Sequence, residues 1–295
     1  MRFMPNDINL KYSIILPAHN EEKFIGNALK SIVQQTYLPK EVIVVNDNST
    51  DATEEIVQGF VENYSFIKMT HSESNQTTHE PGTKIINAFY KGFEKLNSNW
   101  DVIVKLDADV ILPSDYFEKI IQTFQSDKKI GIAGGIAMIE ENGNWIYEKI
   151  GNKKQVRGPF KSYSKDCFEK IGGLKKSIGW DTVDELLAKY YGFEVKVLPE
   201  LEVKLQKPTG KNYQKIHGKK TGEGFYKMDY GWWISVIAAL KASTIKKSPL
   251  LFFTMMKSFL KSSLNADSKI VTKEEGKFIR SLRWRGILKR FINRT

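Results

Sequence analysis

The sequence contains little cysteine and no long apolar run. Its 295 residues include a single cysteine, Cys167, which excludes a disulfide framework and a zinc site built from several cysteines, and favours a reducing compartment. No stretch reaches the roughly 20 uninterrupted apolar residues of a membrane-spanning helix. The first apolar run is broken at Pro17, too early for the core of a signal peptide. We therefore expect the protein to stay in the cytoplasm.

The phosphate-binding fingerprints of two common nucleotide-binding classes are also missing. Neither G-x-G-x-x-G nor G-x-x-x-x-G-K-[ST] occurs, which argues against a dinucleotide-binding protein and a P-loop NTPase. The composition is otherwise that of a folded protein. With 41% apolar and 27% charged residues and a mean hydropathy of -0.37, the chain is neither intrinsically disordered nor a polytopic membrane protein.

Strands and helices are predicted to alternate along the first half of the chain. Short apolar, β-branched runs indicate strands, and apolar residues at helical spacing indicate helices. Strands are expected at 12–17, 41–47, 101–109 and 130–140, and helices at 21–35, about 52–63, 83–96 and from Pro113 onward. This alternation is typical of a parallel α/β sheet.

Polar residues follow the first three of these strands. The segments are PAHNE, NDNSTD and DAD, and ligands of open α/β sheets bind outside the carboxyl ends of the strands. Each segment also has a purely structural interpretation. Asn20 could cap the following helix, Asp47 could be a turn residue, and Asp107 and Asp109 could be solvated loop acids. Their convergence on one edge favours a binding site, and two neighbouring carboxylates favour a divalent cation, Mg²⁺ or Mn²⁺.

These segments resemble a known family in their order and spacing. SIILPAHNEE, EVIVVNDNSTDAT and VIVKLDADVILP are similar to the nucleotide-sugar-binding half of the family-2 glycosyltransferases with the GT-A fold, and the resemblance continues to about residue 230. It implies a catalytic domain at 1–230 with a Rossmann-like mixed α/β sheet, followed by a basic helical extension at 231–295. Within the catalytic domain, a nucleotide-sugar half is expected at about 11–112 and an acceptor half at about 113–230. It implies a hexosyltransferase-type enzyme of bacterial cell-surface polysaccharide synthesis, which moves a sugar by inverting single displacement from a nucleotide-sugar donor, a UDP-sugar above all, to a hydroxyl of a glycan or lipid-linked acceptor.

The resemblance also implies roles for individual residues. The nucleotide-sugar-binding residues would be Pro17, Ala18, Asn20, Glu21, Asp47, Lys84 and Asp107, and the metal-binding residues Asp107 and Asp109. Many relatives carry a further metal-binding His near the position of Leu205 or Gln206, where this chain has none. His217 and His19 are possible substitutes.

The general base of the family is an acid eleven residues before a glycine, and counting back from Gly192 leads to Asp181. We expect Asp181 to be the base, with Asp184 second and Glu185 a further rival. Trp180 occupies the position of the usual Glu and could stack on a sugar or pack in the core. Asp181 could also be an N-cap that forms a capping box with Asp184.

The basic charge is concentrated near the C-terminus. Residues 201–295 carry 21 Lys and Arg against 6 Asp and Glu, whereas the other 200 residues carry 24 against 28. Stretches at 231–240, 249–260 and 278–291 are interpreted as amphipathic helices with Trp or Phe on one face and Lys or Arg on the other. They favour an anionic membrane surface as partner, at the inner face of the plasma membrane, although solvated helices packed on the catalytic domain are the alternative. No nucleic-acid-binding motif accompanies the charge.

Two alternative functions remain open at this point. A sugar-phosphate nucleotidylyltransferase shares the nucleotide fold, but PAHNEE lacks the glycine- and arginine-rich loop expected after its first strand. A non-catalytic polyanion-binding protein, anchored to a membrane surface by its basic tail, would need no nucleotide site.

Overall fold

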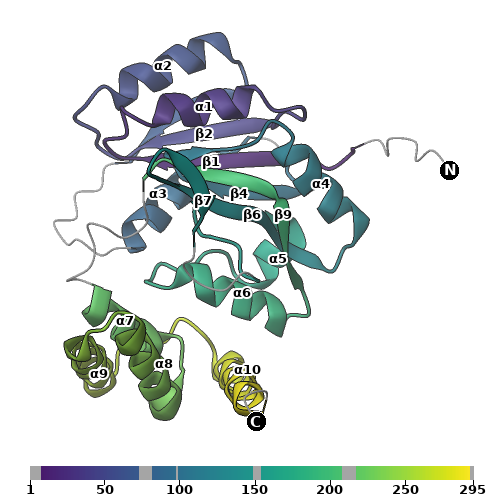
Figure 1. Ribbon diagram of the computed structural model, residues 1–295. Coiled ribbons are helices and arrows are strands. Elements are labelled where there is room, and N and C mark those ends of the chain that lie inside the picture. Colours follow the sequence, from purple (N-terminus) through teal and green to yellow (C-terminus); the bar gives the residue numbers. More distant parts are fainter. Residues whose placement is uncertain (1–7, 73–81, 98, 149–153, 208–216, 293–295) are drawn as a thin grey trace. The chain divides into compact units, whose positions relative to one another are not determined.

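The computed structural model describes residues 8–72, 82–97, 99–148, 154–207 and 217–292 of the chain (Figure 1). The chain divides into two compact units. Unit 1 consists of residues 1–174 and 191–208, and unit 2 of residues 175–190 and 209–295. These units are defined by packing, so the functional division expected at residue 230 stays a prediction.

Unit 1 is built on a mixed β-sheet. The strands follow the order β3-β2-β1-β4-β8-β6-β9-β5, and β7 pairs with β6. The first four are mutually parallel, and β8 is antiparallel to β4. The strands are β1 (Tyr12–Ala18), β2 (Glu41–Asn46), β3 (Ile67–His71), β4 (Val102–Leu106), β5 (Val110–Ile111), β6 (Ile130–Glu141), β7 (Asn144–Tyr147), β8 (Phe160–Ser164) and β9 (Glu194–Leu205).

Apolar periodicity explains the central strands and the helices of unit 1. Every residue of β1, β2 and β4 is buried, as expected for strands covered on both faces. Helix α3 packs closely on them, since a Cβ added at Gly92 would lie 2.7 Å from Ile15 Cγ2 and from Val45 Cγ2. The helices are α1 (Ile25–Val33), α2 (Thr53–Asn63), α3 (Thr83–Phe93), α4 (Tyr116–Ser126) and α5 (Lys165–Lys170).

The strands and helices that were predicted in unit 1 are all present, although β4 ends at Leu106 and not at residue 109. The structure adds strands that were not predicted: β3, β5, β7, β8 and β9. Helix α4 begins three residues after Pro113, because a turn in which the Tyr116 amide donates to the Pro113 carbonyl precedes it. Strand β9 was not predicted, because its Glu and Lys residues interrupt the apolar pattern. Cys167 is buried in α5, as expected for a small core residue.

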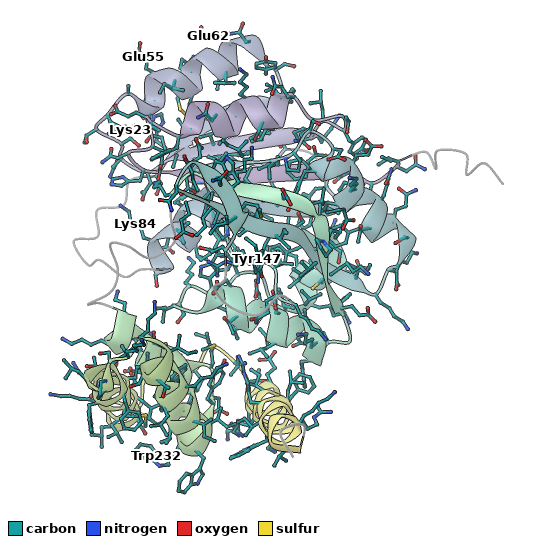
Figure 2. The ribbon with its side chains drawn as sticks, in the orientation of Figure 1. Lys23, Glu55, Glu62, Lys84, Tyr147 and Trp232 are labelled. Atoms are coloured by element: carbon teal, nitrogen blue, oxygen red, sulfur yellow. The ribbon has the colours of Figure 1, made fainter. Side chains whose placement is uncertain are left out.

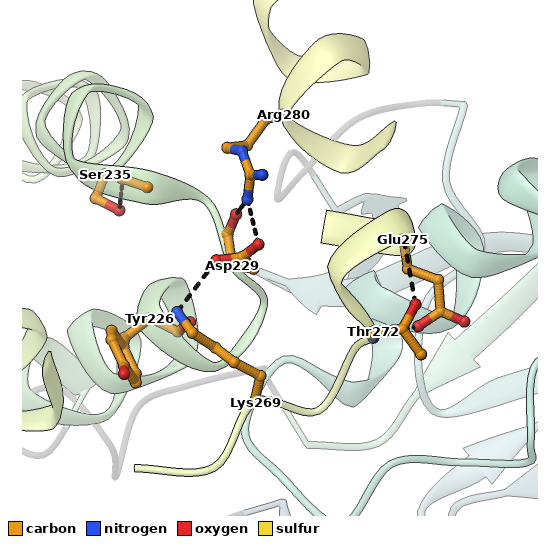
Figure 3. Close-up of polar contacts among 8 residues, drawn as sticks. Tyr226, Asp229, Ser235, Lys269, Thr272, Glu275 and Arg280 are labelled. Carbon is orange, nitrogen blue, oxygen red and sulfur yellow. Dashed lines mark hydrogen bonds and ion pairs between the residues drawn. The ribbon is translucent and has the colours of Figure 1, made fainter. Parts of the chain in front are cut away.

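Unit 2 is helical. Its helices are α6 (Trp180–Tyr190), α7 (His217–Lys227), α8 (Gly231–Ile245), α9 (Pro249–Leu264) and α10 (Lys273–Ile292). Helices α7 and α9 approach so closely that a Cβ at Gly222 would lie 1.9 Å from the Met255 carbonyl oxygen. The α7–α8 turn is held by Asp229, which accepts from Arg280 and forms an ion pair with Lys269 (Figure 3). The three helices expected near the C-terminus are therefore confirmed as helices.

The faces of α8 differ from the expected amphipathic pattern. Its buried residues are mostly small (Ser235, Ala239 and Ser243, with Ile234), because close packing leaves little room there. Its large apolar side chains are exposed instead: 68% for Trp233 and 50% for Leu240. Trp232 also lies at the surface of this helix (Figure 2). Trp233, Ile237 and Lys241 are spaced four residues apart, so they lie on one face of α8, and all three are exposed. The expectation that α8 carries its aromatic and basic residues on opposite faces is therefore wrong.

Helix α9 also exposes large apolar side chains. Leu250 is 74%, Phe253 65% and Leu264 85% exposed, and Lys257 and Lys261 are exposed along the same helix. Among the described residues, no helix is long and apolar enough to cross a membrane.

Candidate active site

The carboxyl ends of β1, β2 and β4 form one rim of the unit 1 sheet. The pairing of the parallel strands brings their ends together. Ala18 and Asn46, the last residues of β1 and β2, are partners, and Ile15 of β1 pairs with Lys105 near the end of β4. The loops that follow are tied together by hydrogen bonds. The Asp47 amide donates to the Ala18 carbonyl at 2.8 Å, and His19 Nδ1 lies 2.6 Å from the Asp47 carbonyl oxygen. The predicted convergence of the first two segments is therefore present.

Asp47 and Lys84 form a pair on this rim. Lys84 belongs to α3 (Figure 2), and its Nζ lies 3.2 Å from Asp47 Oδ2. The Asp47 side chain is 5% exposed, and its Oδ1 has no hydrogen-bond partner among the described residues. A buried carboxylate oxygen without a protein donor is costly unless a ligand hydroxyl or amide satisfies it. This pair has the chemistry to bind a ribose or a base.

The loop between β1 and α1 is shaped by Asn20. Its φ is 54°, a left-handed conformation that Asn tolerates better than most residues. Its Oδ1 accepts from the Thr50 amide at 2.8 Å, which joins this loop to the one after β2. Helix α1 begins only at Ile25, after Phe24, so the interpretation of Asn20 as a helix cap is wrong.

Three carboxylates and two lysines gather where β1, β4 and β9 end. Lys105 contacts Asp107 Oδ1, and Lys207 Nζ lies 2.5 Å from Glu21 Oε1. Burial, and after it the charges of Asp107 and Glu21, raise the pKa of Asp109 to about 7, although the charge of Lys207 acts in the opposite direction. Burial also raises the pKa of Glu21 despite its ion pair with Lys207. Negative charge is thus concentrated here and only partly balanced by protein cations.

The oxygen atoms of this cluster are of the kind that a divalent cation such as Mg²⁺ prefers. Asp107 and Asp109 supply oxygen donors, and the raised pKa of Asp109 indicates that its ionised form lacks sufficient counter-charge. Within the described part of the chain, no group of three or more His, Cys, Asp and Glu could hold a metal by itself. Mg²⁺-type sites often use one or two carboxylates together with substrate phosphates, so donor phosphates would have to complete the shell. His19 is bonded to a loop carbonyl, and the side chain of His217 lies outside the described residues.

Sequence patterns did not single out two residues of the cluster, Lys105 and Lys207. Lys105 is 1% exposed, and its one available signal was a lysine within an apolar strand, two positions before Asp107. Lys207 had no local signal, because its partner Glu21 is 186 positions away in the sequence.

Asp181 and Asp184 belong to α6 of unit 2. Helix α6 begins at Trp180, so Asp181 lies inside the first turn and does not cap the helix. Asp184 and Glu185 are each 1% exposed, and Trp180 is buried at 7%. The rim belongs to unit 1. Which of the three acids serves as base therefore stays a prediction.

Comparisons with known proteins identify a family and relatives of this chain. The description "Glycosyl transferase family 2" matches residues 13–177. The chain is 31% identical to "Probable glycosyltransferase YdaM" of Bacillus subtilis over 217 residues, 64% of this chain and 49% of that protein. It is 29% identical to "Poly-beta-1,6-N-acetyl-D-glucosamine synthase" of Staphylococcus aureus over 165 residues, 56% of this chain and 34% of that protein. The chain thus spans half or less of the length of these curated relatives.

Solved structures share the fold. S. aureus TarS 1-349 in complex with UDP-GlcNAc has a TM-score of 0.56 at 19% identity, and the match covers 75% of this chain and 65% of TarS 1-349. The mannosyltransferase PcManGT from Pyrobaculum calidifontis, in complex with GDP-Man and Mn²⁺, has a TM-score of 0.57 at 15% identity, covering 94% of this chain and 80% of PcManGT. The expected fold class is confirmed.

Proposed function

Because the chain belongs to glycosyl transferase family 2, we propose that it transfers a sugar from a nucleotide-sugar donor to a hydroxyl of a glycan or lipid-linked acceptor, with inversion at the anomeric carbon. One observation carries the proposal: the buried Asp47, paired with Lys84, and the carboxylate cluster lie on the same sheet rim. The family match favours this function over a sugar-phosphate nucleotidylyltransferase or a non-catalytic polyanion-binding protein.

The donor would be held by both parts of the rim. Asp47 would accept hydrogen bonds from the base or ribose, and Lys84 keeps that carboxylate oriented. Pro17, Ala18 and Asn20 would line this side of the pocket. We propose a UDP-sugar, because TarS binds UDP-GlcNAc.

Asp107 and Asp109 would hold Mn²⁺ or Mg²⁺, whose charge would stabilise the diphosphate of the donor. Asp109 is partly buried, and the partial exclusion of water strengthens electrostatic interactions at the diphosphate. Two contacts keep Asp107 in place. Its side chain is paired with Lys105, and its backbone amide donates to the Pro159 carbonyl at 2.8 Å. The carboxylates are thereby positioned before a ligand arrives.

A single displacement needs one general base. The acceptor oxygen attacks the anomeric carbon as the bond to the nucleoside diphosphate breaks, and a carboxylate takes the proton of the attacking hydroxyl. We propose Asp181 as that base, because it lies at a helix start eleven residues before Gly192, the spacing of the family's base, with Asp184 as the second candidate.

The protein would bind peripherally to the anionic inner face of the plasma membrane and meet its acceptor there. Support comes from unit 2, which carries 22 Lys and Arg against 8 Asp and Glu. Its helices α8 and α9 expose large apolar residues beside lysines, a combination that binds the interface of anionic bilayers. Polymer synthesis is proposed from the named activity of the staphylococcal relative.

Two measurements test the proposal. Thermal shift with UDP-, GDP- and dTDP-sugars, with and without Mn²⁺, should show stabilisation by one nucleotide class, and no stabilisation by any would contradict donor binding. With that donor, Asp181→Asn should lower transfer by about 100-fold or more while the thermal shift persists. Asp166→Asn is the matched control, because Asp166 is an exposed acid in the first turn of α5. If only Asp184→Asn abolishes transfer, the base is Asp184.

A further inference from the structure

The end of β9 is fixed beside the carboxylate cluster. The Gln206 amide donates to the Asp109 carbonyl at 2.9 Å. The Gln206 side chain donates to the Phe24 carbonyl at 3.1 Å and accepts from Asn27 Nδ2 at 2.8 Å. These three hydrogen bonds hold the backbone next to Lys207 against both β5 and the start of α1. The position of Lys207 therefore follows from the fold.

The Lys207 ammonium contacts residues of the loop that follows β1. Its Nζ lies 2.5 Å from Glu21 Oε1 and 5.1 Å from the centre of the Phe24 ring. The Lys207 side chain is 41% exposed, whereas the Glu21 side chain is 15% exposed. The ring and the carboxylate anchor the lysine from the protein side, and its remaining surface faces solvent.

The two lysines of the cluster differ in what they can reach. Lys105 is 1% exposed and contacts Asp107 Oδ1, so an incoming ligand cannot reach its ammonium. Lys207 is accessible, and its charge acts on both Glu21 and Asp109. It is therefore the cation of this cluster that an incoming anion can contact.

We propose that Lys207 binds the diphosphate of the donor and supplies part of the positive charge that the departing nucleoside diphosphate requires. A lysine ammonium is a compact point charge well suited to phosphate oxygens. The site then binds a nucleoside diphosphate without a divalent cation, and the cation adds to that binding. This inference rests on the proposed function, because it assumes that the rim receives a nucleotide.

The alternative is a merely structural ion pair. A partly exposed Lys–Glu pair contributes about 0–1 kcal/mol to stability, and its loss would leave nucleotide affinity unchanged. Affinity, measured apart from stability, separates the two interpretations.

Calorimetry of the full chain with UDP, in EDTA and in Mn²⁺, tests the inference. In EDTA the unsubstituted protein should bind UDP, and Lys207→Met should weaken binding about tenfold or more, the loss expected for a charged hydrogen bond. Lys207→Arg should restore most of the affinity. Lys204→Met is the matched control, because Lys204 lies in β9, three residues before Lys207, and its ammonium lies over the Trp145 ring, 5.2 Å from the ring centre; this variant should bind UDP as the unsubstituted protein does.

The outcomes distinguish the two proposals. If the unsubstituted protein binds no nucleoside diphosphate in EDTA or in Mn²⁺, the proposed function fails and the inference fails with it. If it binds UDP only with Mn²⁺, or if Lys207→Met binds normally in EDTA, the inference alone is overturned.

Discussion

Replacing Asp109 by Asn should stabilise the metal-free protein, and the gain should grow with pH. Asp109 has a pKa raised to about 7, first by burial and then by the charge of Asp107. An unfolded Asp titrates near about 3.9. Between these two values the folded state holds a proton that the unfolded state has released, so stability falls as pH rises. Asn keeps the shape of the protonated acid and never ionises.

The size of the effect follows from the two pKa values. Each pKa unit corresponds to about 1.4 kcal/mol, so ionising Asp109 costs folding about 4 kcal/mol above pH ~7.5 and about 3 kcal/mol near pH ~6. Near pH ~4 the cost falls below about 1 kcal/mol, because an unfolded Asp is then about half protonated too, so the two states hold nearly the same number of protons. These figures are upper values, since relaxation around an ionised carboxylate reduces the penalty.

Urea unfolding in EDTA at several pH values measures the difference between Asp109→Asn and the unsubstituted protein. Asp166→Asn, which removes an exposed acid of α5, controls for the change in net charge. The variant should gain stability at high pH and lose transfer activity, because a cation would no longer have this ligand. A gain that does not depend on pH would refute the assignment of a buried, charge-crowded carboxylate.

Three further predictions concern packing and surfaces. Glu148→Gln should destabilise the protein by about 3 kcal/mol in thermal unfolding, because Glu148 is 1% exposed and paired with Arg157 at 3.0 Å; an unchanged melting temperature would contradict it. Gly92→Ala should destabilise the protein by about 1–3 kcal/mol through overpacking against the sheet. Gly59→Ala should stabilise it by up to about 1 kcal/mol, since the added Cβ meets nothing within 4 Å. Urea midpoints of the two variants that shift in the same direction would be inconsistent with this packing. Trp233→Ser should weaken sedimentation with anionic vesicles without changing donor binding, because Trp233 is 68% exposed; equal sedimentation would place the membrane contact elsewhere.

The sequence was sufficient for β1, β2 and β4, because these strands are nearly continuous apolar runs; the parallel strand β3 was not predicted, because Lys68 and Thr70 interrupt its apolar residues. It was insufficient for β9, where Glu and Lys alternate with apolar residues, and that strand carries Lys207 just beyond its end. The same limit applies to α8. Its composition predicted a helix, but periodicity could not predict that small residues such as Ser235 and Ala239 would be buried while Trp233 is exposed.

Local sequence determined where the rim lies. Parallel strands bring their carboxyl ends to one edge, so polar residues after β1, β2 and β4 had to meet, and Asp47, Asp107 and Asp109 could be identified from their places after apolar runs. Only the tertiary structure decided the balance of charge on that rim. Coulomb energy depends on distance in space, and the cations that set it, Lys84 and Lys207, come from segments far along the chain from the acids they contact.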